Sequence, residues 1–252
     1  RWPAKDAPRI GDLVRRFGDR YSLEPGFVWG SLLPGTDVYM LAGTRVRNVD
    51  CSDAADRTCA EIEGRRQAKA IMDLLRAERG DVPARLMDFP TAIGIRDTRH
   101  IRCGYHLSGD DVVEGKRFDD AVANGSYRVD THHQDKPGIT LMYLDGRSEY
   151  AQPGKPTETD RWREPTETDP TFYQVPLRSL VPGTYDNLIL AGRMLDADIT
   201  AFGAVRVMVN TNQMGEAAGV AAALSLAQDM PIDRLSPAVV RKTLAEGGSI
   251  VI

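Results

Sequence analysis

The sequence has few cysteines and no long apolar run, and each absence excludes a class of protein. Its three thiols, Cys51, Cys59 and Cys103, form no closely spaced pair of the kind that binds a metal. An odd thiol count also argues against a disulfide framework, so we expect a reducing, cytoplasmic location. The longest run of small apolar residues, 217–227, is too short to cross a bilayer. We therefore expect no membrane-spanning segment.

An excess of charge of one sign is also lacking. The chain has 32 basic and 36 acidic residues among 252, which gives a formal net charge of -4, and the two signs are interspersed. This pattern indicates neither a nucleic-acid surface nor a membrane surface, so we expect no partner of either kind. The hydrophobic content of 42% is ordinary for a globular protein and suffices for one large or two small domains.

Two further features are missing. No GxGxxG occurs anywhere in the sequence, so the glycine-rich turn with which a Rossmann strand holds a dinucleotide is absent. The chain opens with Arg1 instead of Met and has no apolar signal segment behind it. We expect that it begins within a longer protein or at a processed end.

Local patterns predict a mixture of helices and strands. Thr58 and Glu61 have the spacing of a capping box, which predicts that a long helix opens at Thr58. Apolar spacing and caps predict other helices over 10–17, 118–123 and 203–228 and after Ser236-Pro237. Strands are expected over 38–42, 92–96, 101–107, 127–130, 139–144, 172–177, 188–191 and 249–252. The polar stretch that holds 156–160 and its repeat 165–169 is interpreted as a solvated loop.

The predicted elements do not alternate regularly as βαβ units. This argues for an α+β or composite α/β fold, not for a complete doubly wound domain.

The most informative pattern lies near the end of the chain. An apolar strand, 188–191, runs into Gly192-Arg193, and a helix rich in small residues follows over 214–224. Gly192 permits a tight turn against a ligand, and Arg193 can bind a phosphate or carboxylate with two hydrogen bonds. Small residues allow a helix to approach a planar ring closely, although close packing on a sheet is the better explanation of 215–224 when this segment is taken alone.

Six upstream segments occur in a characteristic order: Thr44–Asp50, Ala60–Arg65, Ile93–Arg99, Gly104–Asp111, Asp130–His132 and Val175–Leu180. Together with Ala191-Gly-Arg193 and Gly215–Gly219, they resemble the C-terminal part of the FAD-dependent oxidoreductase family, within the broad glutathione-reductase-like flavoprotein group. The resemblance extends from about residue 38 onward. It implies the C-terminal part of an FAD/NAD(P)-binding fold with an inserted substrate β-sheet domain.

The resemblance also implies a division of the chain and a cofactor, FAD. An irregular lead-in would span 1–37, a substrate or cap domain 38–180, and the C-terminal part of the FAD-binding domain 181–252. The residues implied to contact or shape the FAD site are Ala191, Gly192, Arg193, Arg206, Gln213, Met214, Gly215, Ala217 and Ala218. Family members open with a GxGxxG segment, so a missing N-terminal segment or a partner chain is expected to hold the ADP half of FAD.

Arginine and histidine crowd the segment 96–106. On an extended strand Arg96, His100, Arg102 and His106 would share one face, with Arg99 on the other. Such a face would clamp an anionic substrate or a flavin phosphate, or it would be a solvated basic strand paired with nearby aspartates. The resemblance favours inward positions for Arg96 and Arg99, with Arg96 near the chemistry and Arg99 near the substrate.

His132 is the candidate acid/base, because an imidazole near neutral pKa suits a proton transfer that accompanies hydride transfer. A surface or hydrogen-bonded loop histidine is the alternative. We expect no metal site, because His132 and His133 have no spaced third ligand. Tyr105 is a candidate for the substrate pocket, although sheet packing also explains it.

The resulting hypothesis is an FAD-dependent oxidoreductase, as a fragment or subunit, that transfers a hydride between a small-molecule substrate and flavin. The arginines favour an anionic or polyhydroxylated substrate. The alternative is a non-catalytic scaffold or interaction subunit that keeps the fold without the cofactor, and the missing GxGxxG supports it.

Overall fold

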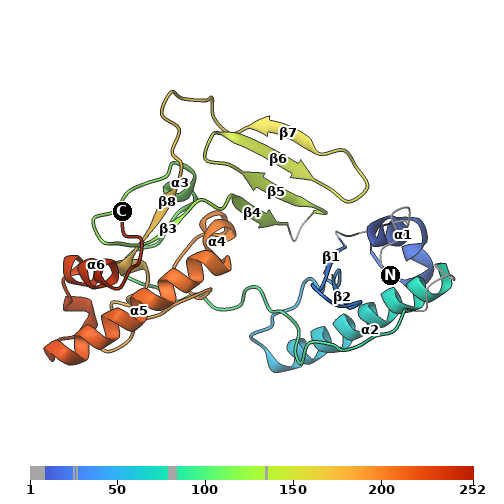
Figure 1. Ribbon diagram of the computed structural model, residues 1–252, viewed down its shortest axis with the longest axis horizontal. Coiled ribbons are helices and arrows are strands. Elements are labelled where there is room, and N and C mark those ends of the chain that lie inside the picture. The colour runs from blue at the N-terminus through green and yellow to red at the C-terminus, as the bar shows by residue number, and fades with distance from the viewer. Residues whose placement is uncertain (1–8, 25, 27, 79–83, 134–135) are drawn as a thin grey trace. The chain divides into compact units, whose positions relative to one another are not determined.

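The computed structural model describes residues 9–24, 26, 28–78, 84–133 and 136–252 (Figure 1). The chain divides into two compact units, one of residues 1–95 with 153–155 and one of residues 96–152 with 156–252. Helices are mixed with small sheets, and the paired strands of the described residues are all antiparallel. This architecture is compatible with the predicted fold class. The predicted division at residues 37 and 180 stays a prediction.

The first unit contains two helices and a hairpin. Its elements are α1 (Ile10–Phe17), β1 (Trp29–Leu32), β2 (Tyr39–Ala42) and α2 (Ala54–Glu78), with a short 3-10 helix over Gly18–Tyr21. Leu13 of α1 and Leu74 of α2 are buried in one small core, on which Tyr39 and Leu41 of β2 also pack. The helix predicted over 10–17 and the strand predicted over 38–42 are confirmed, whereas β1 was not predicted.

Helix α2 begins four residues before the predicted start. The Asp53 carboxylate accepts two amide hydrogen bonds of the first turn, at 2.9 and 3.0 Å, and so caps the helix. Thr58 lies inside the helix and donates its hydroxyl to the Ala54 carbonyl. Glu61 accepts the Ile93 amide at 2.8 Å. The capping-box prediction is wrong because an aspartate placed earlier in the chain supplies the cap.

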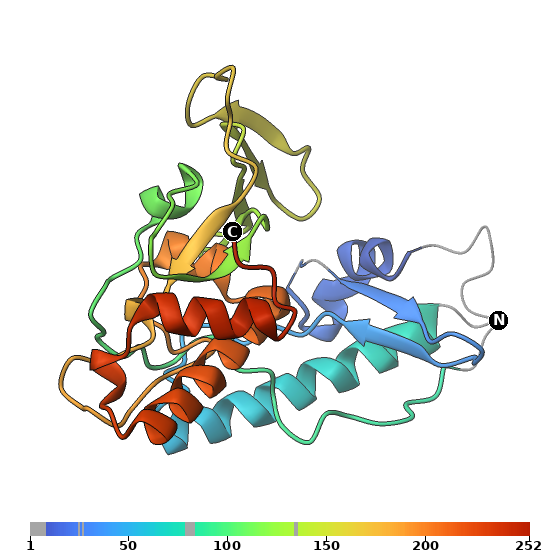
Figure 2. The same ribbon diagram turned by 60° about the vertical axis from the view of Figure 1, so that its left-hand side comes forward.

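The second unit contains most of the strands and the long C-terminal helices. Its elements are α3 (Gly109–Val113), β3 (Ala121–Gly125), β4 (Val129–His132), β5 (Ile139–Met142), β6 (Arg147–Ala151), β7 (Glu158–Arg161), β8 (Tyr173–Pro176), α4 (Ile199–Val205), α5 (Met208–Gln228) and α6 (Pro237–Glu246). Strand β3 pairs with β8, α5 packs on β3, and α6 lies beside α5 (Figure 2). Buried Tyr173, Val175 and Met214 lie in the core between them.

Several local predictions are wrong in this unit. The helix predicted over 118–123 is β3, because its backbone pairs with β8 about 50 residues away. The single helix predicted over 203–228 is two helices, α4 and α5, which separate at Arg206-Val207. The segments 101–107, 188–191 and 249–252 form no named strand, and neither does 92–96 in the first unit. Side-chain and single backbone hydrogen bonds hold the described parts of these segments instead of a sheet ladder.

Strands β4 to β7 form one antiparallel sheet in the order β4-β5-β6-β7 (Figure 1). In its register Asp130 of β4 lies opposite Leu141 of β5. Strand β7 falls inside the polar stretch that the sequence predicted to be a solvated loop. Its four residues are all exposed, and they pair with β6 as an edge strand. A fully polar edge strand lacks the apolar alternation by which strands are predicted.

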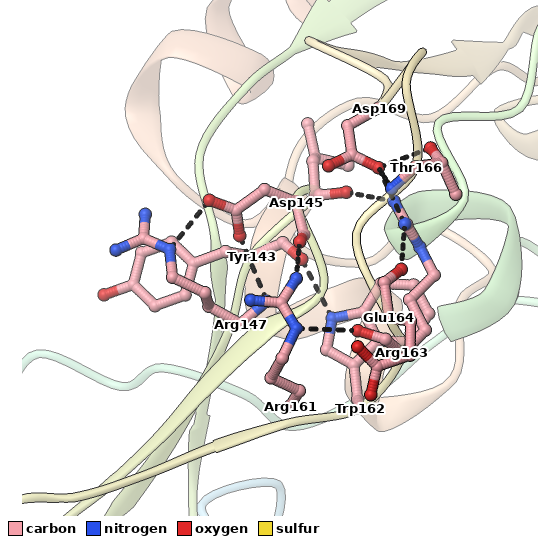
Figure 3. Close-up of polar contacts among 10 residues, drawn as sticks. Tyr143, Asp145, Arg147, Arg161, Trp162, Arg163, Glu164, Thr166 and Asp169 are labelled. Carbon is pink, nitrogen blue, oxygen red and sulfur yellow. Dashed lines mark hydrogen bonds and ion pairs between the residues drawn. The ribbon is translucent and has the colours of Figure 1, made fainter.

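The chain after β7 is fastened to the turn between β5 and β6 (Figure 3). Arg163 donates to the Leu144 carbonyl at 2.6 Å and to the Asp169 carboxylate at 2.7 Å. The same carboxylate accepts the Thr166 hydroxyl at 2.6 Å. The Trp162 indole donates to the Tyr143 carbonyl at 2.9 Å. The segment 162–169 is therefore ordered by charge-assisted hydrogen bonds, in contrast to the solvated loop predicted there.

Among the described residues, no helix combines the length and the apolarity that crossing a membrane requires.

Candidate functional site

The candidate site lies where α4 crosses β4. Gly203 of α4 lies directly on the backbone of Asp130: a Cβ at this position would be 3.1 Å from the Asp130 carbonyl oxygen and 3.2 Å from its nitrogen. Almost every other side chain would push the helix off the strand. The glycine therefore lets α4 contact β4 backbone to backbone, and this contact brings the end of the helix beside the Asp130 carboxylate.

Arg206 follows α4 as its C-cap residue and turns back onto Asp130. Its Nη2 donates to the Asp130 carbonyl oxygen at 3.0 Å and lies 3.3 Å from Oδ2 of the carboxylate. Both side chains are largely buried, with 12% of Arg206 and 16% of Asp130 exposed. The guanidinium also lies 6.0 Å from the ring centre of Phe202. Arg206 thus links α4 and β4 through a partly desolvated ion pair.

His132 and Arg96 complete the charge cluster around Asp130. His132 is two residues further along β4, on the same face of the strand, and its Nε2 is 3.2 Å from Asp130 Oδ1. Burial of the Asp130 carboxyl opposes its ionisation. The neighbouring His132, Arg206 and Arg96 nevertheless hold its pKa below the ordinary value. Asp130 therefore stays ionised at neutral pH.

The His132 imidazole lies beside the Asp130 carboxylate at ion-pair distance, but Asp130 Oδ1 has no hydrogen-bond partner among the described residues. The contact is therefore electrostatic and does not select a tautomer of the ring. The sequence singled out His132, Arg96 and Arg206 separately, and the structure brings all three together on Asp130. Asp130 itself was not predicted as a site residue. The signal for it was its position two residues before His132 in a strand.

The segment 96–109 runs along α4 in the opposite direction. His100 lies edge-on to Phe202 in the middle of the helix, with ring centres 4.9 Å apart. At the other end, the Gly109 amide donates to the Asp198 carboxylate, which also caps α4 through the Ala201 amide. Because the segment is not a regular strand, the predicted alternation of faces for its arginines and histidines does not apply.

The turn at Gly192 has the geometry that its sequence predicted. Its φ is +91°, in the region that favours glycine, and its carbonyl accepts the Leu195 amide at 3.3 Å. Ala191 is half-buried and Arg193 is exposed. A Cβ added to Gly192 would meet no described atom within 4 Å. The turn therefore leaves room for a ligand beside its backbone.

Helix α5 presents two different faces to its surroundings. Met214, Ala217 and Ala218 are buried toward the core, whereas Gly215 is exposed and a Cβ added there would meet no described atom within 4 Å. The Gln213 side chain exchanges two hydrogen bonds of 2.9 Å with the backbone of Asn124 in β3. The structure thus shows a packing role for four of the five predicted residues of this helix and leaves Gly215 facing outward.

The N-terminus of α5 is open. Met208 and Val209 of its first turn are 77% and 63% exposed, and Val207 at the N-cap provides no side-chain cap among the described residues. The amides of this turn, together with the positive end of the helix dipole, are suited to an anionic or electron-rich ligand edge. That the glycine turn, this helix end and Gly215 border a cofactor stays a prediction.

The two residues predicted to contact substrate have different surroundings. The Tyr105 hydroxyl donates to Asp111 at 2.8 Å and accepts from Lys116 at 2.8 Å, and its ring lies edge-on to Phe118. This network anchors Tyr105 beside α3. Arg99 is exposed on the segment that runs along α4.

Comparison with known proteins gives one match. No curated protein and no solved structure matches the chain. The sequence profile of the family described as FAD dependent oxidoreductase matches residues 16–244, which is most of the chain. FAD is the cofactor of this family. The chain therefore belongs to the FAD-dependent oxidoreductase family.

Proposed function

We propose that this chain forms the substrate-facing part and a flavin-facing part of an enzyme that transfers a hydride between a small-molecule substrate and FAD. The observation that carries the proposal is the cluster of His132, Arg96 and Arg206 on the ionised Asp130. Membership of the family indicates FAD as the oxidant, and the cluster provides His132 as a base next to the cations Arg96 and Arg206.

In this proposal the bound FAD supplies the redox chemistry by accepting or returning two electrons with a hydride. His132 takes the proton that the substrate loses when its C–H leaves as hydride, and the neighbouring Asp130 carboxylate stabilises the positive charge that the imidazole gains in this step. Arg96 and Arg206 keep Asp130 ionised, and Arg96, the more exposed of the two, orients the substrate. Gly192, Arg193, Gly215 and the first turn of α5 border the cofactor.

The ADP half of FAD needs a dinucleotide-binding strand and glycine turn, which this sequence does not contain. We propose that a further segment, on the same polypeptide or on a partner chain, supplies it. Nearby arginines favour an anionic substrate.

The first experiment is a visible absorbance spectrum of the chain with added FAD, followed by anaerobic bleaching of the bound flavin with candidate hydroxy acids and amino acids. A His132→Gln variant is expected to keep the bound flavin spectrum and to slow its bleaching by about 100-fold, the usual contribution of a general base. A His133→Gln variant, changed at the next residue, is the matched control and is expected to bleach at the parental rate.

Unchanged bleaching in His132→Gln would refute the acid/base role. Failure to hold FAD, even in the presence of a dinucleotide-binding segment, would favour the alternative of a non-catalytic scaffold.

A further inference from the structure

A second histidine–carboxylate contact lies at the opposite end of α4 from Asp130. His106 Nδ1 is 2.6 Å from Oδ1 of Asp196, and the other carboxylate oxygen accepts the Cys103 amide at 2.8 Å. Asp196 is buried, with 9% of the residue exposed, whereas 58% of the His106 side chain is exposed. One edge of the imidazole is therefore held by a buried carboxylate while the rest of the ring faces solvent.

Backbone hydrogen bonds hold the two segments of this site side by side. The Ile101 amide donates to the Met194 carbonyl at 3.1 Å, and the Leu107 amide donates to the Asp196 carbonyl at 3.0 Å. Leu107 also forms a parallel bridge with Ala197. The contacts lie at both ends of the pairing, so the residues between them are fixed relative to each other.

This pairing brings exposed arginines to the same neighbourhood. Arg102 follows Ile101 on one segment, and Arg193 precedes Met194 on the other. Both are exposed, and neither makes a hydrogen bond or an ion pair with any residue that the structure describes. Two guanidinium groups of this kind attract an anion from solution.

The neighbouring carboxylates have other partners than these arginines. Asp97 contacts Nε2 of His100 at 2.6 Å, and Asp198 accepts the Gly109 and Ala201 amides. Burial and the charge of Asp196 raise the pKa of the Cys103 thiol to about 11, so this thiol stays neutral. The guanidinium groups of Arg102 and Arg193 are therefore available to an anion.

We propose that His106, Arg102 and Arg193 form a binding site for a small anion, a carboxylate or a phosphate. The protonated imidazole donates Nδ1–H to Asp196 and Nε2–H to the anion, and Asp196 stabilises the charged ring in this role. The site stands on its own geometry and does not require that FAD be bound. Arg193 is shared with the proposed flavin turn, so Arg102 and His106 are the residues that test the site.

The test is an NMR titration of the histidine imidazole signals of the full chain at pH 6. Inorganic phosphate and acetate are the probes, and sodium chloride keeps the ionic strength constant. The His106 signals are identified by their loss in His106→Gln. We expect them to shift saturably with at least one probe, and the responding probe identifies the phosphate or carboxylate class.

Arg102→Gln is expected to weaken binding at least tenfold, since it removes a charge-assisted hydrogen bond. Arg147→Gln is the matched control, because Arg147 is another exposed arginine of the same unit and is expected to leave binding unchanged. The proposal is overturned if neither probe shifts the His106 signals saturably, or if both arginine variants bind alike. FAD absorbance is recorded for each variant, so a failed anion titration is distinguished from failed flavin binding.

Discussion

The ion pair between Arg206 and Asp130 gives the sharpest prediction for stability. Arg206→Met keeps an unbranched aliphatic side chain at this position and removes the guanidinium group with its charge. At 3.3 Å and an effective dielectric constant near 20, the lost attraction is about 5 kcal/mol before desolvation is counted. Removing one partner of a buried pair costs about 3–5 kcal/mol, and His132 and Arg96 remain near Asp130. We expect a loss of about 3 kcal/mol in the free energy of unfolding.

Urea unfolding followed by circular dichroism measures this loss, and a double-mutant cycle with Asp130→Asn identifies its cause. If the cost arises from a carboxylate left without its partner, Asp130→Asn in the Arg206→Met background should recover about half of it. The pH dependence has a defined sign. Because the folded-state pKa of Asp130 is lowered, its stabilising contribution is present above the unfolded pKa, near 3.8, and is lost as the pH falls through the lower folded value.

Two results would refute this reasoning. A loss below about 1 kcal/mol would place the pair among exposed ion pairs that contribute little. A full loss without recovery in the double variant would mean that Arg206 stabilises the protein through its bond to the Asp130 carbonyl and through packing, not through the carboxylate.

Five other predictions concern single positions. Gly203→Val should destabilise the protein by about 2 kcal/mol in urea unfolding, because the added Cβ meets the Asp130 backbone. Gly215→Ala should stabilise the FAD-free chain by about 1 kcal/mol, because alanine favours a helix over glycine, and it should weaken FAD binding measured by absorbance. Ser108→Ala removes the N-cap of α3 and should cost about 1 kcal/mol; no change in the urea midpoint would contradict the capping role. Burial lowers the pKa of His100, but the Leu195 carbonyl and Asp97 outweigh burial and raise this pKa. The difference in unfolding free energy between the parent and His100→Gln should therefore be largest below pH 6.5 and shrink as the pH rises through the raised pKa. Hydrogen bonds from Thr166 and Arg163 lower the pKa of Asp169 to about 2. Trp162 fluorescence should therefore stay native-like at pH 4 and change only as the pH approaches 2. A change already at pH 4 would contradict the role of the Asp169 carboxylate in holding this segment.

Local sequence patterns predicted the elements whose own residues determine them. The helix over 10–17 has its apolar stripe within a single segment, and α6 begins at Pro237 after Ser236 as expected. All four residues of strand β8 are buried, and this strand was also predicted. In each case the pattern and the tertiary environment favour the same structure.

Other elements depend on partners far along the chain, and their patterns were misleading. Residues 121–125 contain two alanines and have the composition of a helix end, but β8 pairs with them. The Gln213 side chain completes this arrangement by binding Asn124, 89 residues away. The family resemblance implied Gln213 at the cofactor site, which stays a prediction, whereas its partner in β3 is not visible in the local pattern.

The candidate site also depends on contacts between distant parts of the chain that local sequence patterns do not reveal. The residue types at 96, 132 and 206 indicated polar chemistry, and a family resemblance placed them near a flavin. Their convergence on Asp130 depends on one close approach, Gly203 against β4, that no periodicity encodes. The glycine looked like part of a small-residue helix, whereas its function in the fold is to bring Arg206 to the carboxylate.

Helix α4 joins two of the histidine–carboxylate pairs of this unit, His106–Asp196 and His132–Asp130. A helix of seven residues is too short to be stable alone, so contacts at the two ends of α4 must stabilise it. Asp198 caps the first turn and binds the Gly109 amide, and Arg206 fastens the last turn to Asp130. His106–Asp196 lies near the first end and His132–Asp130 near the second. A change that loosens either end therefore weakens the support of both pairs, so anion binding at His106 and proton transfer at His132 depend on the same short helix.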